Sequence, residues 1–154
     1  MKRVIFGFIL IAALLVGAAP ITRAQAQDLS LERAAVEQAL HAFFDAAQTK
    51  NWASVDSMLA SDFQFYSDSA LTLDKAAFIA AMKDDDMDVG QLALQDVTVA
   101  LSNEGDFAWV KYRAHLESTI KGRPYNMMSV ETVIFRKERG GWKMVHNHAS
   151  IKGL

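Results

Sequence analysis

The sequence predicts an α+β domain in which three N-terminal helices pack on one face of a strongly curved antiparallel sheet. Apolar residues recur at helical spacing between positions 29 and 47. From Leu92 onward the chain instead alternates apolar and polar residues in four runs, separated by turn residues. Helices followed by a series of antiparallel strands are typical of an α+β fold with its helices gathered on one side.

The first 26 residues have the pattern of a secretory signal peptide. Two basic residues precede an apolar run from Val4 to Val16, and Ala24-Gln25-Ala26 is a small-x-small cleavage site. The run is shorter than the roughly 18–20 residues that span a bilayer, which disfavours a retained anchor. We therefore expect a mature domain of residues 27–154 that is periplasmic or secreted and meets the membrane only before cleavage.

The mature chain would be mildly acidic. Cleavage removes three of the 16 basic residues and no acidic one, so 13 remain against 18 and the formal charge is −5. This balance, without a Lys/Arg cluster, argues against nucleic acid as a partner. The sequence has no cysteine, which excludes both a disulfide and a lipid-modified N-terminal cysteine.

The first helix is expected to begin at a cap formed by Asp28 or Ser30 and to end near Thr49-Lys50. Its buried stripe consists of apolar residues that recur every three or four positions: Leu29, Val36, Leu40, Phe43, Phe44 and Ala47.

Two shorter helices should follow. Asn51 can cap a helix from Trp52 to Ala60, and Asp74 can cap another from Lys75 to Lys83. A short strand from Phe63 to Tyr66 is expected between them.

The acidic run Asp84-Asp85-Asp86-Met87-Asp88 comes after the third helix. Negative charge at a helix C-terminus opposes the helix dipole, which favours an exposed loop. Carboxylates also bind calcium, but the glycine and distal glutamate of an EF-hand loop are missing. We expect a solvated loop and no metal.

The rest of the chain is predicted to be β-structure. Turn residues at positions 103–105, 121–124 and 139–141 separate the four strands. These strands are Leu92–Ser102, Phe107–Thr119, Asn126–Lys137 and Trp142–Ile151.

The last strand carries the pattern W-x-x-x-H-x-H-x-S from Trp142 to Ser150. Together with the preceding Ala60-Ser61-Asp62-Phe63 step and the Gly122-Arg123-Pro124-Tyr125 hairpin, it resembles the SnoaL-like branch of the nuclear transport factor 2-like superfamily. The resemblance implies a cone-shaped α+β barrel with an apolar cavity, often dimeric, and it calls for no metal or other cofactor. Asn51-Trp52 stands where the family often has Gly-Asp.

Ketosteroid isomerases are similar in fold and use a tyrosine of the first helix as an oxyanion donor. The corresponding stretch here, Ala42-Phe43-Phe44-Asp45, has no tyrosine. The resemblance therefore does not imply that activity.

Hairpin parity brings polar groups together on the concave face. An even-numbered loop allows His148 to lie directly opposite Glu131, within reach of a carboxylate–imidazole hydrogen bond. A slip of two residues would bring Ser150 there, and an odd loop would separate the pair. Tyr112 and His146 share this face. Further ligand contacts are expected from Tyr66, Asp68, Ser129, Trp142 and Met127.

Two interpretations of this polar group remain open. Glu131 and His148 would exchange a proton with a substrate while Tyr112 or His146 polarises it, or the carboxylate satisfies a buried histidine and nothing reacts. Glu131 with the two histidines also matches a zinc set of two histidines and one carboxylate.

Three functions follow from these expectations. The first is an exported domain that binds a small apolar or amphipathic molecule. The second is an acid–base enzyme without cofactor: an isomerase, dehydratase, cyclase or hydrolase. The third is a dimerisation or assembly module that uses the outer sheet face, where Phe107 and Trp109 lie.

Overall fold

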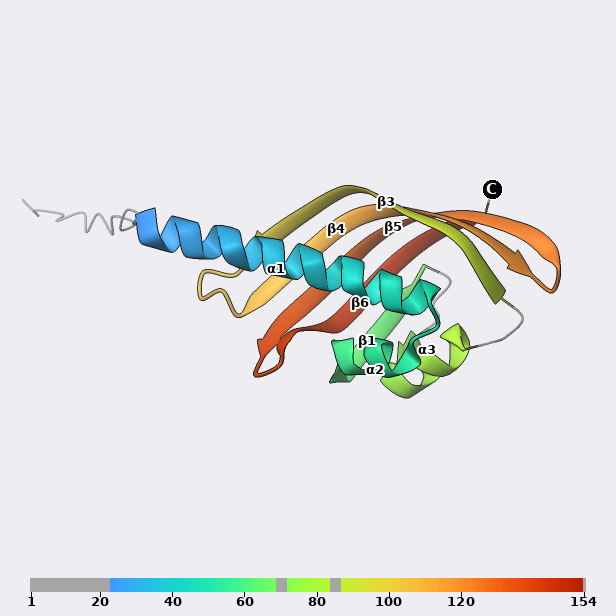
Figure 1. Cartoon of the computed structure of the whole chain (residues 1–154), viewed down its shortest axis with the longest axis horizontal. Helices are drawn as coiled ribbons and strands as arrows, with labels where there is room; N and C mark the ends of the chain where they lie inside the picture. Colours follow the sequence, from blue (N-terminus) through green and yellow to red (C-terminus); the bar gives the residue numbers. More distant parts are fainter. Residues whose placement is uncertain (1–22, 69–71, 84–86, 154) are drawn as a thin grey trace, which may run out of the picture.

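A computed structural model describes residues 23–68, 72–83 and 87–153 and confirms the α+β architecture (Figure 1). Most of the predicted signal peptide, residues 1–22, and positions 84–86 of the acidic run lie outside the described residues. No helix in the described part of the chain is long and apolar enough to cross a membrane. The elements are α1 (Arg23–Gln48), α2 (Trp52–Met58), β1 (Leu59–Ser67), β2 (Thr72–Asp74), α3 (Lys75–Met82), β3 (Met87–Leu101), β4 (Phe107–Ile120), β5 (Arg123–Glu138) and β6 (Gly141–Gly153).

The strands form one sheet in the order β2-β1-β6-β5-β4-β3. β1 runs parallel to β6, and every other neighbouring pair is antiparallel. The sheet curves around α1, which lies across its concave face, while α2 and α3 lie beside β1 (Figure 1). It is not closed into the barrel that the resemblance implied, because β2 and β3 remain as edges.

Irregular residues bend the edge strand β3. Its register with β4 shifts between Val89 and Gln91 and again between Gln95 and Thr98. Asp96, within the second shift, has a left-handed backbone with φ 53°. Such bulges add twist and bend a strand locally, which helps the sheet to wrap around the helix.

The start of α1 differs from the prediction. Asp28 and Ser30 both lie inside α1, which the structure describes from Arg23, so the expected cap at either residue is wrong. The intervening Ala and Gln residues are good helix formers, and nothing in this stretch forces the helix to begin later. The predicted end is confirmed: α1 stops at Gln48, and Lys50 turns the chain with φ 53°.

The two other caps are confirmed. The side chain of Asn51 accepts a hydrogen bond from the Ser54 amide at 3.2 Å. The side chain of Asp74 accepts one from the Ala77 amide at 2.8 Å. Each cap satisfies an amide that lacks a partner within its own helix.

The segment after α2 was expected to stay helical to Ala60, but α2 ends at Met58 and β1 already begins at Leu59. Leu59 is buried and pairs with Met144 of β6. Pairing and burial against the sheet outweigh the local helix preference here. The short strand β2 was not predicted.

The core lies between α1 and the concave face of the sheet. Val36, Leu40 and Phe43 of α1 are buried against alternate residues of β4, β5 and β6. Those sheet residues include Ala108, Val110, Tyr112, Val133, Phe135, Trp142 and Met144. The predicted inward faces of β4 and β5 are therefore confirmed.

Candidate functional site

A single extra residue in β6 decides which side chains reach the interior. Phe135 pairs with Met144, but the next residue back, Ile134, pairs with His146, so Val145 is bulged out of register. Side chains alternate along a strand, and a one-residue insertion sends every following side chain to the other face. Asn147 and Ala149 therefore point inward, whereas His146 and His148 point outward.

The expectation that His148 lies opposite Glu131 is wrong for this reason. Glu131 pairs with Ala149, and His148 pairs with Thr132. The hairpin loop is even-numbered as expected, because Glu138 pairs with Gly141 across Arg139-Gly140. The error comes from the bulge within the strand.

Glu131 instead accepts three hydrogen bonds from neutral groups on three strands. Tyr112 of β4 donates its hydroxyl to Oε2 at 2.6 Å. Ser129, two residues earlier on β5, donates to Oε1 at 2.6 Å. The Asn147 amide donates to Oε2 at 3.0 Å. Within the described residues Glu131 is 9 % exposed, and none of its partners carries a positive charge.

The hydroxyl of Tyr112 is committed to this network. Burial raises the pKa of Tyr112, and the negative charge of Glu131 and the hydrogen bond to it raise the pKa further. The phenol therefore stays protonated and donates a hydrogen bond to the carboxylate. That proton is not free for a substrate oxyanion, the role that the sequence suggested for Tyr112.

An apolar cavity of about 210 Å³ adjoins this network. It lies between the C-terminal half of α1, α3 and the concave face of the sheet. Aliphatic, methionine and phenylalanine side chains form most of the wall, and Glu131 and Asn147 are among its few polar groups. The lining residues are Phe43, Phe44, Ala47, Gln48, Phe65, Phe78, Met82, Val89, Leu92, Ala114, Leu116, Met127, Glu131, Asn147, Ala149 and Ile151.

Asn147 presents an unused acceptor. The residue is 6 % exposed, and its Oδ1 has no hydrogen-bond partner among the described residues. A buried amide oxygen without a partner costs free energy and is uncommon in folded proteins. Asn147 also lines the cavity, so this buried oxygen lies close to any molecule bound there.

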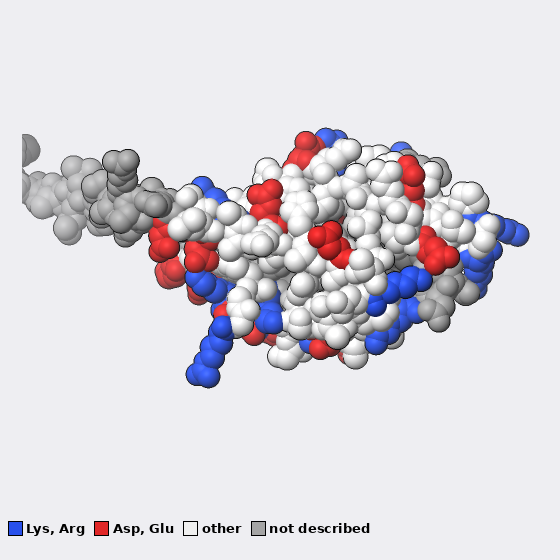
Figure 2. All heavy atoms as spheres, viewed as in Figure 1, with Lys and Arg blue, Asp and Glu red and all other residues white. Residues whose placement is uncertain are grey.

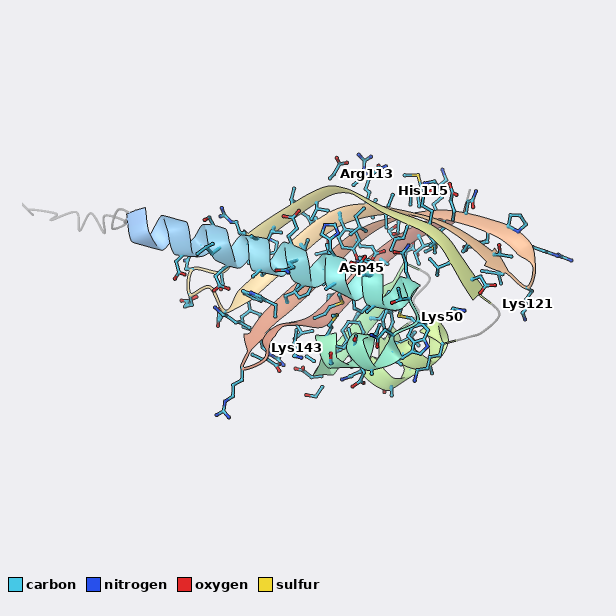
Figure 3. The ribbon with its side chains drawn as sticks, in the orientation of Figure 1. Asp45, Lys50, Arg113, His115, Lys121 and Lys143 are labelled. Carbon is cyan, nitrogen blue, oxygen red and sulfur yellow. The ribbon has the colours of Figure 1, made fainter. Side chains whose placement is uncertain are left out.

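The two histidines lie on the outer face of the sheet. His148 is exposed, and His146 packs its ring against Tyr66 with 5.2 Å between centroids. Burial, with a smaller effect from His148, lowers the pKa of His146. Arg113 and His115 of β4 project from this same side, away from α1 (Figure 3).

The residues predicted to contact a ligand lie in different parts of the structure. Met127 lines the cavity, and Ser129 supports Glu131 at its wall. Tyr66 belongs to the outer face. Asp68 ties β1 to the end of β6, since its Oδ2 accepts from the Ser150 hydroxyl at 3.0 Å and the Ile151 amide at 3.2 Å.

Trp142 lies away from the cavity wall. Its indole nitrogen donates to Oε2 of Glu32 at 3.1 Å, and Lys137 approaches Oε1 of the same carboxylate at 2.5 Å. This contact fixes α1 on β5 and β6. Which of the predicted residues act on a ligand or substrate stays a prediction.

The three residues of the predicted zinc set lie on different faces of the sheet. Glu131 points inward and both histidines point outward. Among the residues that the structure describes, no group of three His, Asp or Glu side chains is placed to hold a metal ion.

Sequence reasoning missed Asn147. Strict alternation from Trp142 onward places Asn147 on the outer face, together with Lys143 and Val145. The run Val145-His146-Asn147-His148-Ala149 reads as alternating in either register. Its neighbours in space, more than its own composition, select the one observed.

A family model for the SnoaL-like domain matches residues 36–152. The chain belongs to this family. No curated protein matches the chain, whereas many solved structures do.

Three of the solved structures illustrate the range of the fold. A nuclear transport factor 2-like protein of unknown function in nutrient uptake from Rhodospirillum rubrum is 23% identical, with a TM-score of 0.70 over 76% of this chain and 98% of that one. A putative dehydratase from Streptomyces avermitilis is 20% identical, with a TM-score of 0.64 over 80% and 96%. The CaMKII hub of S. rosetta is also 20% identical, with a TM-score of 0.65 over 79% and 96%. At these identities the likeness establishes the fold alone.

Proposed function

We propose that this protein binds a small apolar or amphipathic molecule in the cavity between α1, α3 and the concave face of the sheet. The observation that carries the proposal is an apolar cavity with Glu131 and the unsatisfied Asn147 at its wall. Binding pockets of small molecules commonly combine apolar walls with a few polar groups that orient the ligand. The volume of about 210 Å³ suits a molecule somewhat larger than benzene, which occupies a cavity of about 150 Å³.

Binding is favoured over acid–base catalysis by what surrounds Glu131. The proposed Glu131–His148 pair does not form, and three donors already engage the carboxylate. An enzymatic role also has support, because one protein of similar structure is described as a putative dehydratase. Catalysis by Glu131 alone is the second candidate, supported by its place at the cavity wall.

Thermal unfolding with a panel of small apolar and amphipathic molecules tests the binding function. A molecule that binds only the folded state at 100 times its dissociation constant adds about 2.7 kcal/mol of stability. Ala149→Leu should fill part of the cavity and abolish the shift, because Ala149 is buried at its wall. His148→Leu, one residue away on the outer face, is the matched control and should keep it.

The outcomes separate the two candidates. A ligand shift that Ala149→Leu removes, without turnover of the bound molecule, supports a binding protein. Turnover that Glu131→Gln abolishes while binding persists would establish the enzyme. No shift from any molecule in the panel would contradict the binding proposal.

We also propose that the outer sheet face joins two copies of the chain. This face exposes large apolar residues: Phe107 is 38%, Trp109 45% and Val130 59% exposed. Apolar groups clustered on one face of a soluble protein commonly mark an interface. Support also comes from the similarity to the CaMKII hub of S. rosetta. Sedimentation equilibrium of the mature chain should give twice the monomer mass.

We propose that the domain acts after export to the periplasm or the medium. The support is the basic, apolar and small-residue pattern of residues 1–26. N-terminal sequencing of the protein recovered from the periplasm or the medium should begin at Gln27. Recovery only as a full-length membrane-bound chain would contradict both cleavage and release.

A further inference from the structure

We propose that the cavity selects organic cations, namely small ammonium compounds with an apolar or aromatic tail. This inference rests on the proposed binding function and names the ligand class of the same site. It follows from the charge and hydrogen-bonding character of the polar wall.

The cavity holds one negative charge that has no counter-ion. Among its described lining residues Glu131 is the single ionisable side chain, and the salt bridges found elsewhere in the described chain do not include it. Its three partners, Tyr112, Ser129 and Asn147, are neutral donors. A buried carboxylate with dipolar partners alone still lacks the stabilisation that an opposite charge supplies.

Two oxygen atoms at this wall have unused acceptor capacity. Oε1 of Glu131 accepts from Ser129 alone, so it retains acceptor capacity. Oδ1 of Asn147 is buried and accepts from no described residue. Tyr112 uses its one hydroxyl donor on Glu131, and the Asn147 amide uses one of its two N–H groups there. A ligand that brings N–H donors on a charged head suits the carboxylate of Glu131, with the Asn147 oxygen close by, and an ammonium group has three such donors.

The remaining wall suits an aromatic or alkyl tail. Phe44 meets Tyr112 edge-to-face at 5.7 Å, and Phe78 packs against Phe65 at 5.3 Å. These aromatic side chains offer apolar contact, and ring faces attract cations as well. A carboxylate ligand would instead meet Glu131 with like charge.

Three probes that share one skeleton test the ligand class: phenethylamine, phenethyl alcohol and phenylacetate. Calorimetric titration of the wild-type mature chain at neutral pH should show the ammonium compound binding about tenfold more tightly than the alcohol, since charge-assisted hydrogen bonds are about twice as strong as neutral ones. Phenylacetate should bind most weakly. In NMR spectra, the side-chain carboxylate carbon of Glu131 should shift with the amine and much less with the alcohol.

Two variants separate a site effect from general attraction to an acidic protein. In Glu131→Gln the amine and the alcohol should bind about equally tightly, because the ligand's charge then meets a neutral amide. Glu138→Gln removes a negative charge from the same strand outside the cavity and should leave the advantage intact.

The results distinguish this inference from the function on which it rests. If the alcohol binds as tightly as the amine or more tightly, the cation preference is overturned. If Ala149→Leu also abolishes that binding, the cavity remains a binding site. Tight binding of phenylacetate would also overturn it. Failure of all three probes to bind would contradict both proposals. If Glu131→Gln does not fold, the cation preference is still tested on the wild type. The affinities of the three probes and the NMR shift of the Glu131 carboxylate carbon then decide it.

Discussion

At the scale of single residues, the polar centre of the molecule is a carboxylate held by its neighbours. Glu131 is nearly buried, and the groups that hold it come from β4, β5 and β6. A buried charge costs several kcal/mol unless hydrogen bonds compensate for it. The network therefore ties the three central strands together, and any donor removed from it should register in the stability.

Tyr112→Phe should destabilise the fold by about 1–3 kcal/mol, because it leaves the buried carboxylate one donor short. Urea unfolding of the mature chain measures the difference. Tyr66→Phe is the matched control: Tyr66 lies at the exposed outer face, so its change should stay within about 0.5 kcal/mol. Equal stability of Tyr112→Phe and the wild type would show that the hydroxyl does not support Glu131.

At the scale of elements, the bulge in β6 determines which side chains reach the cavity. Up to Met144 the strand follows the alternation expected from the sequence, and beyond it every side chain is reversed. Asn147 thereby replaces a histidine as the neighbour of Glu131. The register of this one strand can be tested directly because the chain contains no cysteine.

Paired cysteines should form a disulfide at Thr132 and His148 and fail to do so at Glu131 and His148. Thr132 and His148 are directly opposite and on the same face, a placement that brings Cα and Cβ atoms within the range of a disulfide. Cysteines at 131 and 148 would point to opposite faces. Thiol titration after mild oxidation measures both, and rapid cross-linking of the second pair alone would refute the bulge.

Two helix caps and a hairpin turn were predictable because they depend on residues close together in sequence. Asn51, Asp74 and the Lys121-Gly122 turn carry their own local signals, and all three are confirmed. The inward faces of β4 and β5 followed from alternation. The start of β1 at Leu59 and the bulge at Val145 depend on contacts with distant strands, so the local pattern did not contain them. At the candidate site, two of the partners of Glu131, Tyr112 and Ser129, were placed on its face from the sequence. The third, Asn147, was missed because its inward position depends on the bulge at Val145.

The contact of Glu32 with β5 and β6 is also an interaction between distant elements. The hydrogen bond from Lys137 lowers the pKa of Glu32, helped by the Trp142 indole and the charge of Lys137, although burial opposes the shift. A carboxyl whose pKa is lowered by folding adds stability above its ordinary value of 4.5 and loses it as the pH falls through the lower, folded value.

Glu32→Gln should therefore be less stable than the wild type by a constant amount from about pH 5 to 7, and the gap should narrow below that range. We expect a gap of less than about 1 kcal/mol, because the ion pair is partly exposed to solvent. Urea unfolding at several pH values measures it. Glu37→Gln, exposed on the same helix, should show no such narrowing. A gap that is independent of pH would mean that the Lys137 contact contributes nothing through charge.

At the scale of the whole molecule, the sheet separates two surfaces of different character. Its concave side encloses the core, the Glu131 network and the cavity, while its outer side exposes aromatic and β-branched residues. On the face that α1 crosses, acidic and basic side chains are scattered among neutral ones (Figure 2). Because the sheet lies between them, the proposed ligand site and the proposed dimer face can be altered independently.

Trp109→Lys should weaken the proposed dimer by about 2 kcal/mol, roughly thirtyfold in its dissociation constant, since large aromatic residues dominate the energy of interfaces. Trp109 is 45% exposed in the single chain and carries none of the cavity wall, so ligand binding should persist in the monomer. Sedimentation velocity over a range of concentrations measures the association. Leu31→Lys, which alters a 63% exposed residue of α1, is the control and should leave it unchanged. A dimer that tolerates Trp109→Lys but is broken by Leu31→Lys would assign the interface to α1, and the outer sheet face would then have to serve another partner or none.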